Sequence, residues 1–96
     1  SDSIGVVAPT GQKPEEVTLR AYGPFADYLR KHPFHHSQVE RNDMGSFTSF
    51  DYTLLVTDEL VDEILALGDK VEITFPEKLR MKLLQKIGRI KNRYII

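Results

Sequence analysis

The stretch GDKVEITFPEKLR, residues 68–80, decides the fold because it joins three secondary structure elements with almost no loop between them. Gly68 follows an apolar helical stripe and suits the left-handed conformation in which helices often end. The next residues alternate between apolar and polar, which predicts a short strand. We expect one face of this strand to carry Val71, Ile73 and Phe75. Pro76 is then well suited to open a helix, because the first helical turn does not need the N–H that proline lacks.

The residues before this stretch predict the rest of a sheet and the helices that cover it. Strands are predicted at 16–22, near 36–41 and at 47–56, and helices at 24–32 and 57–67, with a turn at 42–45. In the 47–56 strand, one face is predicted to carry Phe50, Tyr52, Leu54 and Val56. The order β-α-β-β-α-β followed by a C-terminal helix is the ferredoxin-like α+β arrangement, an antiparallel sheet with its helices on one face.

The other face of the predicted sheet is polar, so it cannot form a second core. Its predicted members are Thr18, Arg20, Tyr22, Ser49, Asp51, Thr53, Glu72 and Thr74. This face either meets water or packs on another domain.

Length and composition indicate a single domain. The chain has 96 residues, of which 41% are hydrophobic and 28% charged, as in ordinary globular domains. Residues 1–15 have no periodic pattern and are predicted to be a linker or tail, so the domain is predicted at 16–96. The chain contains no cysteine, no signal-peptide core and no apolar run near the roughly 18 residues of a membrane span. We therefore expect a cytoplasmic protein without membrane contact.

The charge is unevenly distributed although the net charge is only −1. Residues 76–96 contain seven Lys and Arg but one acid, so the C-terminal helix is strongly basic. The cationic ladder of this helix comprises Lys78, Lys82, Lys86, Arg89 and Arg93. The apolar seam beside the ladder comprises Leu79, Leu83, Ile87, Ile90 and Tyr94. The ladder either binds an anionic ligand, such as nucleic acid phosphates, or pairs with the acidic remainder of the protein.

Two arginines are candidates for contact with a ligand or a partner. Arg80 lies in the first turn of the last helix, where the helix dipole disfavours a cation, so it needs an acidic partner such as Glu72, a ligand or another domain. Arg20 is predicted on the polar sheet face, where it pairs with Asp51 or Glu72 across strands, or contacts another domain or an anion.

Three histidines surround a Pro-Phe turn at 32–36, but without cysteine they do not match a recognised metal-ligand spacing. We therefore predict no metal and no cofactor. His36 and Gln38 are candidates for a contact surface instead.

Enzyme motifs are absent from the sequence. An acylphosphatase-like enzyme has the same size and topology, but it needs a phosphate-binding loop that ends in arginine directly after the first strand. Here residues 22–25 read YGPF, and the next arginine is Arg30. The sequence therefore favours a protein that is not an enzyme.

Two long segments carry a family resemblance. They are TDELVDEILALGDKVEITFPEKLRMKLLQKIGRIKNRYI at 57–95 and VTLRAYGPFADYLRKHPFHHSQ at 17–38, where PFHHSQ is the most distinctive part. In order and spacing these segments resemble the C-terminal extension, or WCX domain, of bacterial WYL-domain transcriptional regulators. The resemblance covers roughly residues 15–95.

The resemblance implies a ferredoxin-like regulatory domain that helps in dimerisation and relays a sensed signal. In that family a helix-turn-helix domain binds DNA, and a WYL domain senses ligands that include nucleotide-like ones. The implied partners are therefore a WYL domain of the same chain, a second subunit, DNA through the helix-turn-helix domain, and a nucleotide or nucleic acid effector. The family supplies no ligand residue set, so Arg20, His36, Gln38 and Arg80 remain candidates from the residues alone. A stand-alone domain that binds an anionic ligand or single-stranded nucleic acid is the alternative.

Overall fold

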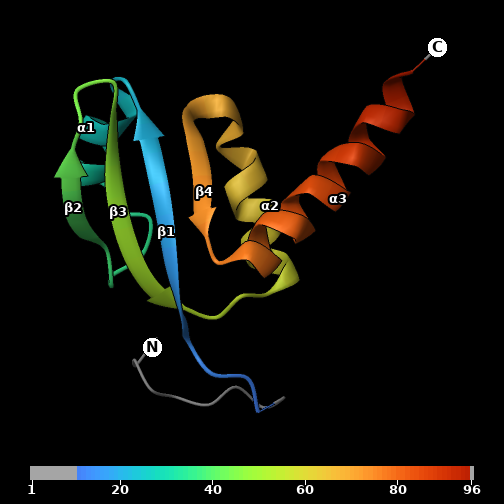
Figure 1. Ribbon diagram of the computed structural model, residues 1–96, viewed down its shortest axis with the longest axis horizontal. Coiled ribbons are helices and arrows are strands. Elements are labelled where there is room, and N and C mark those ends of the chain that lie inside the picture. The colour runs from blue at the N-terminus through green and yellow to red at the C-terminus, as the bar shows by residue number, and fades with distance from the viewer. Residues whose placement is uncertain (1–10, 96) are drawn as a thin grey trace.

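A computed structural model describes residues 11–95 as a sheet covered on one face by two helices, with a third helix projecting from one end (Figure 1). The strands are β1 (Glu15–Tyr22), β2 (Val39–Asp43), β3 (Phe47–Leu54) and β4 (Val71–Phe75). The helices are α1 (Phe25–Lys31), α2 (Asp58–Ala66) and α3 (Glu77–Tyr94), with a short 3₁₀ turn η1 (Gly68–Lys70) before β4. Most of the predicted linker, residues 1–10, lies outside the described residues.

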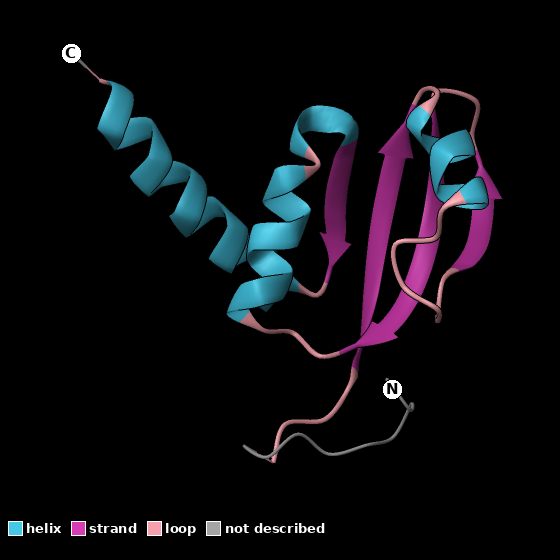
Figure 2. Ribbon diagram, turned by 180° about the vertical axis from the view of Figure 1, so that it is seen from behind, coloured by secondary structure: helices cyan, strands magenta, loops and turns pink. Residues whose placement is uncertain are grey.

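The sheet has the order β2-β3-β1-β4, and all neighbouring strands are antiparallel. This order and the β-α-β-β-α-β sequence of elements confirm the predicted ferredoxin-like α+β fold. Both α1 and α2 cover the same face of the sheet, as the view from behind shows (Figure 2). The opposite face stays uncovered within the described chain.

The core lies between the sheet and these helices, where the predicted alternation holds for the two central strands. Residues Val17, Leu19 and Ala21 of β1 and Phe50, Tyr52 and Leu54 of β3 are buried, together with Leu60, Val61 and Ile64 of α2.

Both ends of α2 form as the sequence predicts. The Thr57 hydroxyl accepts a hydrogen bond from the Leu60 N–H at 3.1 Å and caps the helix. Gly68 adopts φ 64° directly after α2, which is the left-handed conformation expected of a helix stop.

The second strand is displaced from its predicted position. It runs from Val39 to Asp43 rather than from His36 to Arg41, so part of the predicted turn belongs to the strand. The side chains of Ser37 and Gln38 bind backbone and side-chain groups of neighbouring elements, which holds this segment out of the sheet. A bulge between Glu40 and Asn42 shifts the register of β2 against β3.

The prediction that Phe75 shares a face with Ile73 is wrong. A register shift pairs Ile73 with Leu19 but Phe75 with Thr18, which lies on the open face. A bulge of this kind inserts one residue and redirects the side chain that follows. The side chain of Phe75 is consequently 53% exposed instead of contributing to the core.

Candidate interaction site

Helix α3 is anchored at its N-terminal end only. Leu79 and Leu83 are buried against the domain, whereas the later members of the predicted apolar seam are not. Ile87 is 46%, Ile90 44% and Tyr94 80% exposed. Figure 1 shows the second half of α3 pointing away from the sheet and α2. The helix continues unbroken through Gly88.

Arg80 fixes the anchored end. Its Nη1 donates a hydrogen bond to the Ile73 carbonyl of the edge strand β4 at 2.6 Å. The guanidinium also lies 3.9 Å from Glu72 and 3.4 Å from Glu77. These partners explain how a cation is held against the helix dipole, and Glu72 is the acid that the sequence suggested.

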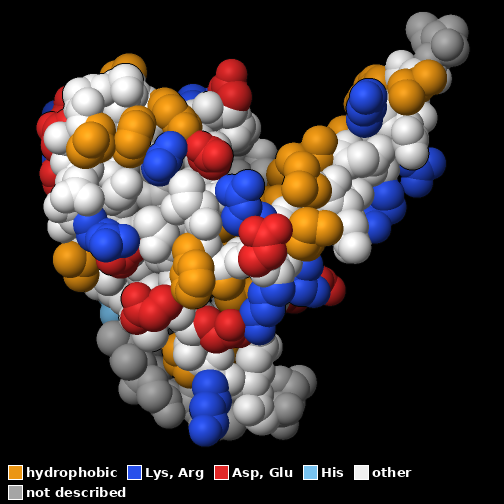
Figure 3. All heavy atoms as spheres, viewed as in Figure 1, with side chains coloured by type: hydrophobic (Ala, Val, Ile, Leu, Met, Phe, Trp, Pro, Cys, Tyr) orange, Lys and Arg blue, Asp and Glu red, His pale blue; other side chains and the backbone are white. Residues whose placement is uncertain are grey.

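An apolar groove of about 240 Å³ lies where α3 diverges from α2 and β4. Its lining is mostly aliphatic and comprises Ile64, Leu65, Gly68, Val71, Glu72, Ile73, Arg80, Leu83, Leu84 and Ile87. Along α3 the groove continues into the exposed seam, and Figure 3 shows hydrophobic side chains along the helix edge that faces the body. The groove and the seam together form one apolar surface, which we call the α3 surface.

The cationic ladder divides between paired and unpaired members. The Lys78 ammonium lies 2.7 Å from Glu15 and the Lys86 ammonium 3.0 Å from Asp62, so these two pair with the domain body. Lys82, Arg89 and Arg93 form no ion pair with any residue of 11–95. In Figure 3 basic side chains follow the edge of α3 opposite the apolar one.

Arg20 does not form the predicted cross-strand ion pair. Its guanidinium lies over the Phe47 ring, 4.3 Å from the ring centre, in a cation–π contact. The two acids suggested as its partners bind other groups. Asp51 accepts a hydrogen bond from Thr18 at 2.8 Å and pairs with Arg41 at 3.2 Å. Glu72 accepts a hydrogen bond from the Tyr22 hydroxyl at 2.6 Å and pairs with Arg80.

The chain matches the family model of the WCX domain over residues 13–91. It belongs to the WCX domain family. No curated protein matches the sequence.

Membership confirms the resemblance read from the sequence. The WCX domain is a regulatory domain associated with WYL-type regulators and is not a known enzyme family. The predicted WYL and helix-turn-helix domains stay predictions.

Of the four candidate contact residues, Arg20 and Arg80 lie on the β1–β4 side of the sheet. Arg20 is the register partner of Glu72, which Arg80 contacts, but the Arg20 guanidinium itself lies over Phe47 of β3. His36 and Gln38 lie instead in the connection between α1 and β2, and β2 is the edge strand opposite β4.

Gln38 ties this connection to the rest of the WCX domain. Its Oε1 accepts hydrogen bonds from the Tyr52 hydroxyl at 2.7 Å and from the Phe34 N–H at 3.1 Å. Its Nε2 donates to the Leu29 carbonyl at 2.8 Å. Burial raises the pKa of Tyr52 above its ordinary value, so the phenol stays protonated and donates. All these partners belong to the domain itself, so the contacts that the structure gives Gln38 are internal.

The neighbouring histidines and serine complete the connection. Ser37 donates from its N–H to His35 Nδ1 at 3.2 Å, and its hydroxyl accepts from the Thr53 N–H at 2.9 Å. The His36 ring packs on His35 with ring centres 4.2 Å apart. Within residues 11–95, no group of three or more potential ligand side chains could hold a metal ion. The same residues contain no helix that is long and apolar enough to span a membrane.

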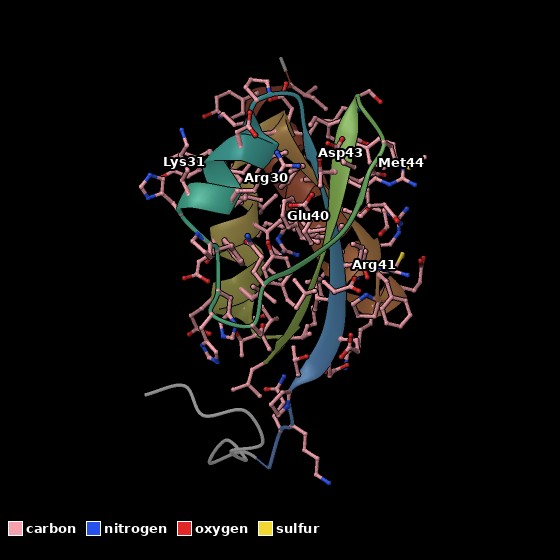
Figure 4. All side chains as sticks on the ribbon, turned by 90° about the vertical axis from the view of Figure 1, so that its left-hand side faces the viewer. Arg30, Lys31, Glu40, Arg41, Asp43 and Met44 are labelled. Atoms are coloured by element: carbon pink, nitrogen blue, oxygen red, sulfur yellow. The ribbon has the colours of Figure 1, made fainter. Side chains whose placement is uncertain are left out.

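An ionic cluster that was not predicted from the sequence joins α1 to β2. Arg30 donates hydrogen bonds to Glu40 at 2.8 Å and to Asp27 at 2.5 Å, and it lies 3.6 Å from Asp43. Figure 4 shows the side chains of Arg30, Glu40 and Asp43 beside one another. The hydrogen bonds from Arg30 lower the pKa of Glu40, and those to Glu40 and Asp27 raise the pKa of Arg30. Spacing could have suggested only the Asp27–Arg30 pair, because Glu40 comes from another element.

Proposed function

We propose that this WCX domain is the C-terminal regulatory and dimerisation domain of a WYL-type transcriptional regulator, and that it acts through the α3 surface. The domain would relay effector sensing by the WYL domain to the helix-turn-helix domain. The observation that carries this proposal is a projecting helix whose apolar seam is exposed, within residues 11–95, at Ile87, Ile90 and Tyr94.

Apolar surfaces of this kind are typical of interaction sites rather than of free monomer surfaces. Most of the stability of a protein helix comes from packing of its apolar face. The second half of α3 has no such packing among the described residues and contains Gly88, which disfavours helix by about 1 kcal/mol relative to alanine. A partner that covers the seam would stabilise this half, and its arrival could therefore be coupled to a signal.

The test uses the gene of the full-length regulator. Ile90→Asp places a charge in the seam without touching the core, and the transcript levels of the cell are compared with those of the unaltered strain. Gln85→Asp, an exposed change on the same helix, is the matched control. We expect Ile90→Asp to reproduce the transcript changes that deletion of the regulator causes, and Gln85→Asp to leave transcript levels as they are in the unaltered strain. Unaltered transcripts at equal protein level in the Ile90→Asp strain would contradict the proposal.

A second candidate function is binding of single-stranded nucleic acid or another anion by α3. It is favoured by the unpaired Lys82, Arg89 and Arg93, which repeat along one edge of the helix. Fluorescence anisotropy with a labelled single-stranded oligonucleotide tests it, because binding to phosphates weakens steeply as salt rises. Absence of binding at low salt would exclude this function for the domain.

A further inference from the structure

We propose that the apolar groove between β4, α2 and the root of α3 binds an aliphatic carboxylate, with the hydrocarbon chain in the groove and the carboxylate on Arg80. This inference goes beyond the proposed function, which concerns the exposed seam of α3 and the partner that covers it. It assigns a small-molecule site to the domain itself and stands without that partner. A bound chain would contact all three elements and thereby stabilise the direction in which α3 leaves the domain.

The walls of the groove are almost entirely hydrocarbon. Apart from Gly68 and two charged residues, every lining residue is Val, Leu or Ile. Ile64 and Ile73 belong to the core, whereas Leu84 of α3 is 56% exposed, so part of this apolar lining meets water. The volume of about 240 Å³ is that of about eight waters at roughly 30 Å³ each, which sets the length of the chain at about eight carbon atoms.

Arg80 supplies the positive charge of the lining, and most of its hydrogen-bond donors are unused. A guanidinium group has five N–H donors. Within residues 11–95, Arg80 donates one hydrogen bond, from Nη1 to the carbonyl of Ile73, which itself lines the groove. The guanidinium therefore lies beside the groove. Its Nη2 group forms no hydrogen bond with any residue in this range.

The two acids near Arg80 leave its charge available to a ligand. The Nη1–Glu72 distance of 3.9 Å and the Nε–Glu77 distance of 3.4 Å both exceed an N–H···O hydrogen bond of about 2.7–3.2 Å. Glu72 is held elsewhere, because it accepts a hydrogen bond from the Tyr22 hydroxyl at 2.6 Å.

The head group that suits this environment is a carboxylate. Arginine binds carboxylates through two parallel N–H groups, and Arg80 has such donors to offer. A phosphate is less suitable, because its second negative charge would lie close to Glu72 and Glu77. The site therefore combines one cation with an apolar groove, which is the complement of a fatty acid of medium length.

The test is an NMR titration of the 96-residue chain with octanoate, hexanoate and octanamide. Amide and methyl resonances of the lining residues report where each compound binds. Each methylene that enters the groove tightens binding by up to about fourfold, so we expect octanoate to bind about tenfold more tightly than hexanoate. Octanamide has the length of octanoate but no charge, and we expect it to bind at least about tenfold more weakly than octanoate.

Four variants locate the site. Arg80→Gln is expected to reduce the affinity for octanoate to that for octanamide, while the unchanged affinity for octanamide shows that the groove is intact. Lys91→Gln removes an exposed cation of α3 outside the lining and is the matched control. Leu84→Asp places a carboxylate in the lining and is expected to abolish binding of both compounds. Met81→Asp makes a similar change at an exposed position of α3 outside the lining, and binding should stay the same.

Three results would overturn the inference. They are the absence of octanoate-dependent shifts in the lining at millimolar concentration, equal affinities for octanoate and octanamide, and equal binding of octanoate by Leu84→Asp and Met81→Asp. If Arg80→Gln binds neither compound, the substitution deforms the groove, and the comparison of octanoate with octanamide on the unaltered chain decides. The transcript test of Ile90→Asp does not depend on this titration, so the inference and the proposed function can fail separately.

Discussion

Gln38 joins three parts of the domain through one side-chain amide, since it binds α1, the segment before β2 and the buried Tyr52. We predict that Gln38→Ala lowers the free energy of unfolding by about 2 kcal/mol, because it leaves the Tyr52 hydroxyl and two backbone groups without partners. Urea denaturation followed by circular dichroism measures this change. Gln85→Ala makes the same chemical change at an exposed position of α3, and we expect it to alter stability by less than about 0.5 kcal/mol. Equal effects of the two substitutions would contradict the role of Gln38.

The Arg30–Glu40 pair gives the link between α1 and β2 a defined pH dependence. The pKa of Glu40 is lowered from its ordinary 4.5, so the folded state favours the carboxylate. Its stabilising contribution is therefore present above pH 4.5 and is lost as pH falls through the lowered pKa. We predict that Glu40→Gln lowers Tm at pH 7 and that this difference disappears under acid conditions. The control is Glu63→Gln, which removes a carboxylate without a partner, and a pH-dependent Tm difference of equal size there would refute the assignment.

Arg80 holds the first turn of α3 against the free edge of β4. We predict that Arg80→Ala lowers the free energy of unfolding by about 1–2 kcal/mol, because the Ile73 carbonyl loses a charge-assisted hydrogen bond. Thermal unfolding of the variant is compared with that of Lys82→Ala, which removes an unpaired cation from the same helix. If Lys82→Ala is as destabilising, the hydrogen bond to Ile73 is not the cause.

At the scale of single residues, the sequence could identify Arg80 and its partner Glu72 because both lie in one short stretch and the helix dipole requires compensation. It could not find the partner of Arg20. The choice between Asp51, Glu72 and Phe47 depends on which acids are already bound by Arg41 of β2, Tyr22 of β1 and Arg80 of α3. Gln38 was similarly predicted to contact a partner, because nothing in its neighbours shows that Tyr52 lies beside it.

At the scale of elements, two glycines allow opposite predictions. Gly68→Ala is expected to lower the free energy of unfolding by about 1–2 kcal/mol, because φ 64° brings Cβ too close to the backbone. Gly88→Ala is expected to raise it by up to about 1 kcal/mol, because Gly88 lies inside α3 and a Cβ there meets no atom within 4 Å. Chemical denaturation measures the free energy of unfolding of both variants, and each variant serves as the control for the other. Destabilisation by Gly88→Ala would show that the backbone at this position is not that of a regular helix.

The elements themselves were largely predictable, because the apolar periods of β1, β3 and α2 are clear. Gly68 and Pro76 are also strong signals for the end of one helix and the start of the next. The error in β2 arose because the side chains of Ser37 and Gln38 bind groups of other elements and hold the segment before Val39 out of the sheet. The error in β4 arose where a bulge interrupts the alternation. A bulge depends on how a strand meets its neighbour, so the alternation of a single strand does not reveal it. Phe75 was consequently assigned to the core although it lies on the open face.

At the scale of the whole molecule, the association of two copies should depend on both salt and the apolar seam. We predict that raising NaCl from about 50 to 500 mM weakens the dimer of the proposed function by several-fold, because ionic contacts of the unpaired Lys82, Arg89 and Arg93 are screened over a Debye length of about 4 Å at the higher concentration. Ile90→Asp should weaken it at every salt concentration. Sedimentation equilibrium at a series of salt concentrations measures both effects, and a dimer that becomes tighter as salt rises would show that the ionic contacts contribute nothing.

The direction of α3 also has a mechanical consequence. An 18-residue helix is about 27 Å long, and here its buried attachment is confined to the first two turns, at Leu79, Arg80 and Leu83, with the ion pair of Lys86 and Asp62 one turn further on. A rotation of only about 10° at Pro76 would therefore move the far end by about 5 Å, close to one helical turn. A small movement at the Arg80 contact with β4 therefore becomes a larger displacement of the half of α3 that carries Ile90 and Tyr94. A sub-ångström change beside Glu72 would reach the far end of the helix magnified several times.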